Sequence, residues 1–344
     1  MVEPRFSGVF SALRAFRPRA RSGCLAVAAL MAATAAPLHA TGVAITVDDL
    51  PVYGRFWTAA EGKDVTDRLL AGMQRNHWKA TGFVNEIQLD AADRPARIAL
   101  LEAWLDAGMD LGNHTYSHPS LTKTPVETYI ADVARDETVT APLLAARGRR
   151  EHWFRYPFLE TGTTQAVRTR FEGWLGEHGY RVAPVTMENS DWQFATLYDA
   201  AIARGDVTAA ARVRQQYLTF TREIVAWYKQ AARTLFGREP RFVFLLHASR
   251  LNAASIDALA AILRDARLRP ITLDAAMRDP AYRTADHYVG PDGNEWLERW
   301  SQTLNKRLPF ETMPRVPKAV VAGDARLEAI PDPRAPASVI PAHS

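Results

Sequence analysis

Short apolar runs alternate with longer amphipathic stretches from residue 43 onward, and this alternation is the strongest constraint on the fold. The runs cover residues 43–47, 80–84, 109–111, 152–154, 181–185, 241–246 and 270–273. Between several of them apolar residues recur at helical spacing, as in 65–78, 96–107, 126–146 and 208–236. Such alternation predicts βαβ units and a parallel sheet covered by helices. The seven runs predict a barrel-like α/β fold, one strand short of the usual eight, with its chemistry at the C-terminal ends of the strands.

The pattern also suggests how the chain divides. We expect a signal peptide in 1–40, one catalytic domain in 41–280, and a C-terminal helix followed by a Pro/Ala-rich tail in 281–344. The longest helical stretch ends at Gly237, because glycine is a common helix stop. From Pro314 onward proline and alanine dominate and helical periodicity is lost, which predicts an extended or disordered tail.

The charge of the chain is concentrated at its start. The formal net charge is +4, and residues 1–40 hold five arginines against one acid, which accounts for the whole excess. The remaining residues balance to zero and offer no basic face, so nucleic acid is not an expected partner.

The first 40 residues also have the pattern of a secretory signal. An arginine-rich stretch leads into an apolar run from Cys24 to Pro37, with small residues suitable for cleavage near Ala36 or Ala40. The run is shorter than the roughly 20 residues that a membrane-spanning helix needs. We therefore expect a secreted or periplasmic protein with no stable membrane span. Removal of Cys24, the only cysteine, would exclude a cysteine-ligated zinc site.

Candidate metal ligands stand at the ends of two apolar runs. His114 and His118 are four residues apart, a spacing that brings two imidazoles together if the chain turns helically. Asp48 and Asp49 follow the first run, and Pro51 indicates that the strand ends there, where both carboxylates can reach one site. Two histidines and one carboxylate leave open positions for water and substrate, as in catalytic metal sites.

Further polar residues stand at the ends of later runs. These are Arg155 in the segment 154–158, Asp191 with Trp192, and His247 at the end of 243–247. A histidine that closes a buried strand lies where catalytic residues gather in such barrels. Each of these features alone is weak.

Taken in order, these pieces resemble the five motifs of the NodB-homology polysaccharide deacetylases, carbohydrate esterase family 4. The motifs are Asp-Asp, His-x-x-x-His, Arg-x-Pro-Phe, Asp-Trp and Leu-Leu-His, and the resemblance covers roughly residues 42–277. The resemblance implies a distorted (β/α)7 barrel with parallel strands and outer helices. It also implies an acetylated polysaccharide or oligosaccharide as substrate. Val47 stands where the family usually has an aromatic residue, and the stretch between Asp191 and His247 is longer than expected.

Carried over to this sequence, the resemblance implies a role for each motif residue. Asp49, His114 and His118 would hold a divalent cation, with zinc expected and Co²⁺, Ni²⁺ or Mn²⁺ as alternatives. Asp48 would be the general base that activates water, and Arg155 would keep it ionised and oriented.

The resemblance assigns the remaining roles to the later motifs. The backbone N–H of Phe158 would help to bind the oxyanion. His247 would protonate the departing amine, with Asp191 tuning its pKa and Trp192 forming a wall of the pocket. Because the long stretch after Asp191 exceeds one crossover, we expect residues 194–198 to shape the sugar-binding cleft. A purely structural hairpin packed on the outside of the barrel is the alternative for this segment.

Two alternatives remain open from the sequence. An esterase of the same fold would remove O-linked acetyl groups from xylan or aryl esters, but it would need a general acid less. A non-catalytic carbohydrate-binding protein would typically lack a metal ligand or the base, and neither is missing here.

Overall fold

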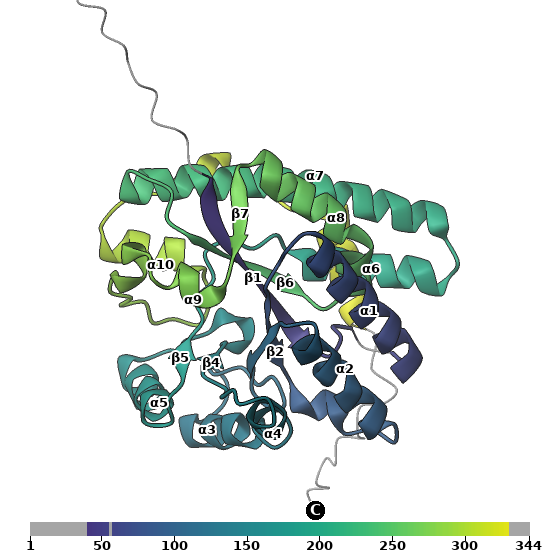
Figure 1. The fold of residues 1–344 in the computed structure, drawn as a ribbon. Helices are drawn as coiled ribbons and strands as arrows, with labels where there is room; N and C mark the ends of the chain where they lie inside the picture. Colours follow the sequence, from purple (N-terminus) through teal and green to yellow (C-terminus); the bar gives the residue numbers. More distant parts are fainter. Residues whose placement is uncertain (1–39, 55–56, 330–344) are drawn as a thin grey trace, which may run out of the picture. The chain divides into compact units, whose positions relative to one another are not determined.

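The computed structural model describes residues 40–54 and 57–329, and the proposed signal peptide and the last residues of the tail lie outside this part. In the described part seven parallel strands form one curled sheet surrounded by helices (Figure 1). The strands are β1 Thr41–Leu50, β2 Thr81–Val84, β3 Asp110–Asn113, β4 Trp153–Phe154, β5 Arg181–Val182, β6 Phe242–His247 and β7 Leu268–Ile271. Each of the seven predicted runs overlaps a strand, so the predicted distorted (β/α) barrel is confirmed.

Helices follow most of the strands, as a βαβ chain requires. The longer ones are α1 Ala59–Arg75, α2 Arg94–Asp106, α3 Val126–Arg135, α5 Gln165–Glu177, α6 Asp191–Ala203, α7 Val207–Phe236 and α8 Arg250–Asp265. The shorter ones are α4 Thr140–Ala145, α9 Leu273–Ala276, α10 Trp296–Thr303 and α11 Lys318–Glu328, with single 3₁₀ turns at Glu86–Leu89, Pro157–Leu159, Pro280–Arg283 and Phe310–Thr312. As predicted, α7 stops at Gly237, which adopts the left-handed conformation with φ 71°.

β1 is the organising strand of the sheet. The strand order is β5-β4-β3-β2-β1-β6, and β7 pairs with the first residues of β1. Because Val43 and Ala44 pair with both β6 and β7, these two strands lie on opposite edges of β1. β2 takes the β7 edge from Thr46 onward. The segment after β5 reaches β6 through Met187, whose carbonyl accepts the Leu245 N–H at 3.0 Å and brings the two ends of the sheet together.

Alternate residues of β1 build the inside of the barrel in layers. Ala44, Thr46 and Asp48 share one face, because side chains of a strand alternate. Ala44 belongs to a small apolar cluster with residues of β2, β4, β6 and α9. Thr46 accepts a hydrogen bond from the buried Arg155, and Asp48 lies one step nearer the C-terminal end. The opposite face of β1 packs on the helices in the main core.

Two expectations about helices were wrong. The stretch 126–146 is not one helix, because the Glu86 carboxylate binds the N–H groups of Val139 and Thr140 and caps a new helix there. The chain after Pro314 is not wholly extended, since α11 occupies residues 318–328. Its Val320 is buried, and it packs on α6, so tertiary packing stabilises a helix that periodicity did not reveal.

None of the helices in the described part is long and apolar enough to cross a membrane.

Candidate functional site

The two adjacent carboxylates meet at one site because β1 is irregular there. The strand ends at Leu50, directly before Pro51 as the sequence indicated, and its pairing to β2 shifts between Val47 and Leu50. Asp49 has a left-handed backbone with φ 62°. This irregularity removes the usual alternation, so both carboxylates reach the same histidine: His114 Nε2 lies 3.8 Å from Asp48 Oδ2 and 3.6 Å from Asp49 Oδ1.

The histidine pair comes from a loop after β3, so the helical turn under which this spacing would bring the imidazoles together is absent. Thr115 and His118 both have a positive φ, 67° and 55°, and the Thr115 hydroxyl accepts the His118 N–H at 3.0 Å. The ring centroids of His114 and His118 are nonetheless 4.9 Å apart. Residues held in uncommon backbone conformations cluster at functional sites, and Asp49 belongs to the same group.

Asp49, His114 and His118 form a candidate metal centre. Their possible ligand atoms all lie within 4.8 Å of one another, and His118 Nε2 is 3.5 Å from Asp49 Oδ1. The His114 Nδ1 atom is 2.8 Å from the Arg155 carbonyl, which can only accept, so Nε2 keeps its lone pair for a cation. Burial lowers the pKa of His114 well below its ordinary value, which favours the neutral ligand form.

An unpartnered carboxylate oxygen also indicates that a divalent cation fits these residues. Asp49 Oδ1 is buried and has no hydrogen-bond partner in the described part of the chain. A buried carboxylate oxygen without a partner is costly, and a cation bound between it and the two imidazoles would remove that cost. Two nitrogens and one oxygen suit zinc and related transition metals.

Asp48 and Arg155 form a buried ion pair beside this group. Arg155 Nη1 donates to Asp48 Oδ2 at 3.3 Å, and its Nη2 donates to Thr46 Oγ1 at 3.0 Å. The Arg155 guanidinium also lies 4.7 Å from the centre of the Phe83 ring. Burial raises the pKa of Asp48 to about 6, although the charge of Arg155 opposes this shift. The other oxygen, Oδ1, is buried and without a partner in the described residues.

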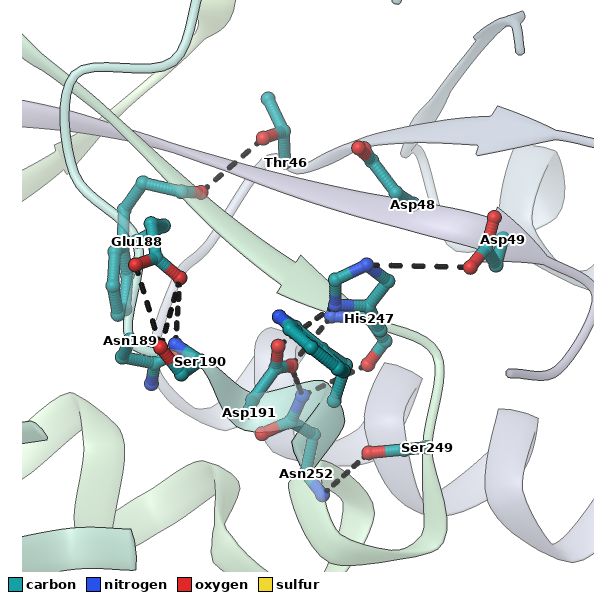
Figure 2. Close-up of polar contacts among 12 residues, drawn as sticks. Thr46, Asp48, Asp49, Glu188, Asn189, Ser190, Asp191, His247, Ser249 and Asn252 are labelled. Carbon is teal, nitrogen blue, oxygen red and sulfur yellow. Dashed lines mark hydrogen bonds and ion pairs between the residues drawn. The ribbon is translucent and has the colours of Figure 1, made fainter. Parts of the chain in front are cut away.

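On the other side of Asp49 stands His247 at the end of β6. Its Nδ1 lies 2.7 Å from Asp191 Oδ1, and its Nε2 lies 4.0 Å from Asp49 Oδ2 (Figure 2). Burial alone lowers the pKa of His247, but the charge and hydrogen bond of Asp191 outweigh burial and raise the pKa to about 9. For Asp191 burial acts in the opposite direction and raises the pKa. The charge of His247 and the hydrogen bonds to the carboxylate outweigh burial, so the pKa of Asp191 is lowered overall.

A hydrogen-bonded network holds Asp191 in place. Asn252 Nδ2 donates to Asp191 Oδ2 and to the His247 carbonyl, and Asn252 Oδ1 accepts from the Tyr217 hydroxyl at 2.6 Å. Ser190 has a left-handed backbone, and its N–H donates to Glu188 at 2.6 Å (Figure 2). Sequence reasoning missed Asn252 and Glu188, because an Asn in the first turn of a helix and a Glu in a loop carry no chemical signal of their own.

Aromatic side chains flank the candidate metal centre. Phe158 has φ 55° and is 56% exposed, and its ring centroid lies 4.5 Å from that of His118. Tyr53 lies on the other side, with its ring centroid 5.1 Å from that of His247. Trp192 is half-buried in the first turn of α6, next to Asp191. Tyr53 was not predicted, since it follows the carboxylates without any motif of its own.

Phe194 does not line a cleft, and that expectation was wrong. It is fully buried, and its ring packs on Tyr217 and Phe220 at centroid distances of 5.7 and 5.8 Å. Phe194 belongs to α6, and the inner side of this helix is part of the core. Tyr198 on the same helix is half-buried.

A comparison with known protein families covers the part of the site that comes first in the sequence. Residues 36–174 match the family model of polysaccharide deacetylase. The predicted resemblance to the polysaccharide deacetylases is confirmed over this segment. The matched segment contains Asp48, Asp49, His114, His118 and Arg155, and it ends before Asp191 and His247.

Several solved structures resemble this chain. A family 4 carbohydrate esterase from Streptomyces lividans is 21% identical, with 69% of this chain and 95% of that chain covered and a TM-score of 0.44. A chitin deacetylase from Colletotrichum lindemuthianum is 20% identical, with 72% and 91% covered and a TM-score of 0.47. A family 4 pseudoenzyme from Bacillus anthracis is 14% identical, with 70% and 66% covered and a TM-score of 0.47. No curated protein sequence matches the chain.

Proposed function

We propose that this protein is a metal-dependent hydrolase that removes acetyl groups from N-acetylated sugars of a polysaccharide. The observation that carries the proposal is the order of groups across the site. A base held by an arginine (Asp48) and a histidine held by a carboxylate (His247) stand on either side of one candidate metal group. Amide hydrolysis needs this division, because water must lose a proton and the amine must gain one.

Asp48 suits the role of general base. Arg155 fixes one carboxylate oxygen, which leaves the unpartnered Oδ1 to accept a proton from an attacking water. A carboxyl pKa of about 6 also makes Asp48 a stronger base than an ordinary aspartate while it is still ionised at neutral pH.

His247 suits the role of general acid. Its Nδ1 is committed to Asp191, so the Nε2 hydrogen of the imidazolium is left for the substrate. With a pKa of about 9 the ring is protonated at neutral pH and can donate to a departing nitrogen. Amines leave poorly without a proton, whereas phenolates and many alkoxides need less help, which favours an amide over an ester substrate.

A bound divalent cation would supply polarisation of the acetyl carbonyl and a lower pKa for water. Asp49, His114 and His118 are the residues that would hold it, with zinc as the proposed ion. The backbone N–H of Phe158 is proposed to bind the oxyanion from the adjacent turn, and Trp192 and Tyr53 to contact the sugar. From the N-terminal segment we further infer secretion or export to the periplasm.

Acetate release tests the proposal directly. The purified protein is incubated with N-acetylated oligomers of chitin and peptidoglycan type and with O-acetylated xylan and aryl acetates. We expect release from at least one N-acetylated polymer, loss of activity with dipicolinate, and recovery with zinc or cobalt. Release from esters alone would support the O-acetyl esterase instead. Binding to an acetylated glycan without any turnover would support a carbohydrate-binding protein.

A further inference from the structure

Helix α3 presents hydrogen-bonding groups to the loop that carries the two candidate histidine ligands. The Asp136 side chain, which follows the last turn of α3, accepts the His114 N–H through Oδ2 at 3.2 Å. Its other oxygen accepts the Glu86 N–H at 2.7 Å. Asp136 is fully buried, so this single carboxylate ties the end of β3 to the segment after β2.

Asp132, one turn earlier, binds the far end of the same loop. Its Oδ1 accepts the Ser117 N–H at 2.9 Å, and its Oδ2 accepts the Ser117 hydroxyl at 2.7 Å. The Asp132 carbonyl accepts the Tyr116 N–H at 3.2 Å. Between the two acids, the Val133 carbonyl accepts from the Asn113 side chain at 3.0 Å.

These contacts follow from the geometry of the helix. Asp132 and Asp136 are four residues apart, so they lie on the same face of α3. That face meets the loop from Asn113 to His118, which would not be expected to hold its shape alone, because Thr115 and His118 are in the left-handed region. The helix is itself fixed by Tyr129, which is fully buried with its ring centroid 5.0 Å from that of Phe171 in α5.

We propose that Asp132 and Asp136 are positioning residues that set the loop bearing His114 and His118 before any cation binds. Neither acid reaches the candidate ligand atoms, and both act through backbone N–H groups and Ser117. The consequence for metal affinity rests on the proposed function, whereas the anchoring of the loop is a property of the chain alone.

The test uses Asp132→Ala, Asp136→Asn and the control Glu127→Ala. Asp132 is half-buried, so its alanine variant should fold. Asp136→Asn replaces one accepting oxygen with an NH2 group, which cannot accept a hydrogen bond from the N–H that it faces. Glu127 is an exposed acid on the same helix that pairs with Arg170 on α5, so its loss removes an acid without touching the loop. Asp132→Asn retains one acceptor for Ser117 and serves as the conservative variant.

Two measurements are made on each protein. Amide hydrogen exchange of the peptide covering 113–118 is followed without metal, and zinc affinity is measured by competition with a chromophoric chelator. We expect Asp132→Ala and Asp136→Asn to speed exchange in this peptide about tenfold. Other peptides should be unchanged, except that Asp136→Asn should also affect the peptide containing Glu86, whose N–H binds the same carboxylate. Zinc affinity should fall by the roughly 10- to 100-fold typical of lost outer contacts, with partial recovery in Asp132→Asn and no change in Glu127→Ala.

Unchanged exchange in 113–118 for Asp132→Ala would overturn the anchoring, whatever the fate of Asp136→Asn. Faster exchange with wild-type zinc affinity would overturn the claim that anchoring prepares the metal centre. A wild-type protein that takes up no zinc, cobalt, nickel or manganese would overturn the proposed function, and the exchange data would then decide the anchoring separately.

Discussion

The Nδ1 atom of His247 lies 2.7 Å from Asp191 Oδ1, and Oδ2 of the same carboxylate accepts the His247 backbone N–H at 2.7 Å. One carboxylate thus holds both the ring and the backbone of the residue that we propose as the acid. Asp191 starts α6 and His247 ends β6, so the contact also joins a helix to the sheet.

This contact predicts different effects on amide and ester substrates. His247→Ala should lower amide hydrolysis by about 10²- to 10⁴-fold, the range typical of a lost general acid. Aryl acetates should be affected much less, because phenolate leaves without a proton. Parallel kinetics on an N-acetylated oligomer and an aryl acetate give the measurement. Equal losses on both would mean that His247 acts structurally or on the oxyanion.

Asp191→Asn should displace the pH profile. Asparagine removes the charge that raises the pKa of His247, so the imidazolium should lose its proton at a lower pH. The alkaline limb of kcat/KM for the amide should therefore move from near pH 9 toward neutral pH. Ser190→Ala keeps the backbone N–H that binds Glu188 and leaves the contact between Asp191 and His247 in place, so this control should show the wild-type pH profile.

Asp48 and Asp49 should separate catalysis from metal binding. Asp48→Asn should keep the bound metal and lose turnover by about 10²- to 10⁴-fold, since a neutral amide cannot take a proton. Asp49→Asn and His118→Ala should lose metal instead. Metal content by atomic emission, measured beside acetate release, distinguishes the two classes. A fully active Asp48→Asn protein would contradict the mechanism.

Glu151 predicts a stability change with pH away from the site. Its side chain is 6% exposed and accepts from the Tyr180 hydroxyl at 2.9 Å, and burial raises its pKa to about 8. An acid with a raised pKa in the folded state binds a proton that the unfolded chain has already released. Its stabilising effect is complete below the unfolded pKa and is lost as pH rises through about 8.

Glu151→Gln removes this dependence. Urea unfolding between pH 5 and 9 should show that the wild-type free energy of unfolding falls by up to about 1.4 kcal/mol per pH unit more steeply than that of the variant. Glu177→Gln, an exposed acid on α5, should behave as the wild type. Identical slopes for the wild type and Glu151→Gln would show that the buried carboxyl does not titrate in this window.

Phe194 and Trp192 should have opposite phenotypes. Phe194→Ala empties a fully buried position and should lower stability by about 3–5 kcal/mol while leaving KM unchanged. Trp192→Ala should leave stability nearly intact and raise KM on a polymer more than on a minimal acetylated sugar. Thermal unfolding and kinetics on both substrates would check the pair. A KM effect confined to Phe194→Ala would reverse our assignment of core and cleft.

Residue patterning was enough to predict the strands and most helices, because apolar runs and helical spacing reflect burial directly. It was not enough for local backbone at the site. That Asp48 and Asp49 reach one histidine depends on a pairing irregularity in β1, and the loop of His114 and His118 is bound by Asp132 in α3 and by Asp136 just after it. Such features arise from tertiary hydrogen bonds, which do not produce a repeating pattern of residues in the sequence.

The same limit explains the errors at α6 and α11. Phe194 looks like a cleft residue when only its distance from Asp191 in the sequence is considered, and its burial becomes evident only once α7 packs over it. Helix α11 lacks a clear apolar stripe, and the partner that stabilises it, α6, lies more than a hundred residues earlier. Both the burial of Phe194 and the formation of α11 therefore depend on residues that are distant in the sequence.

The pairing of β1 along both edges bears on which ions the site can accept. Asp48 belongs to a strand hydrogen-bonded to β6 on one side and to β7 and β2 on the other, so a shift of its backbone would break several ladders at once. His118 sits on a loop held mainly by side chains. A change in ionic radius should therefore be absorbed by displacement of His118, with the carboxylates almost stationary. The architecture thus favours tolerance of several divalent cations, since the proton acceptor keeps its place whichever ion is bound.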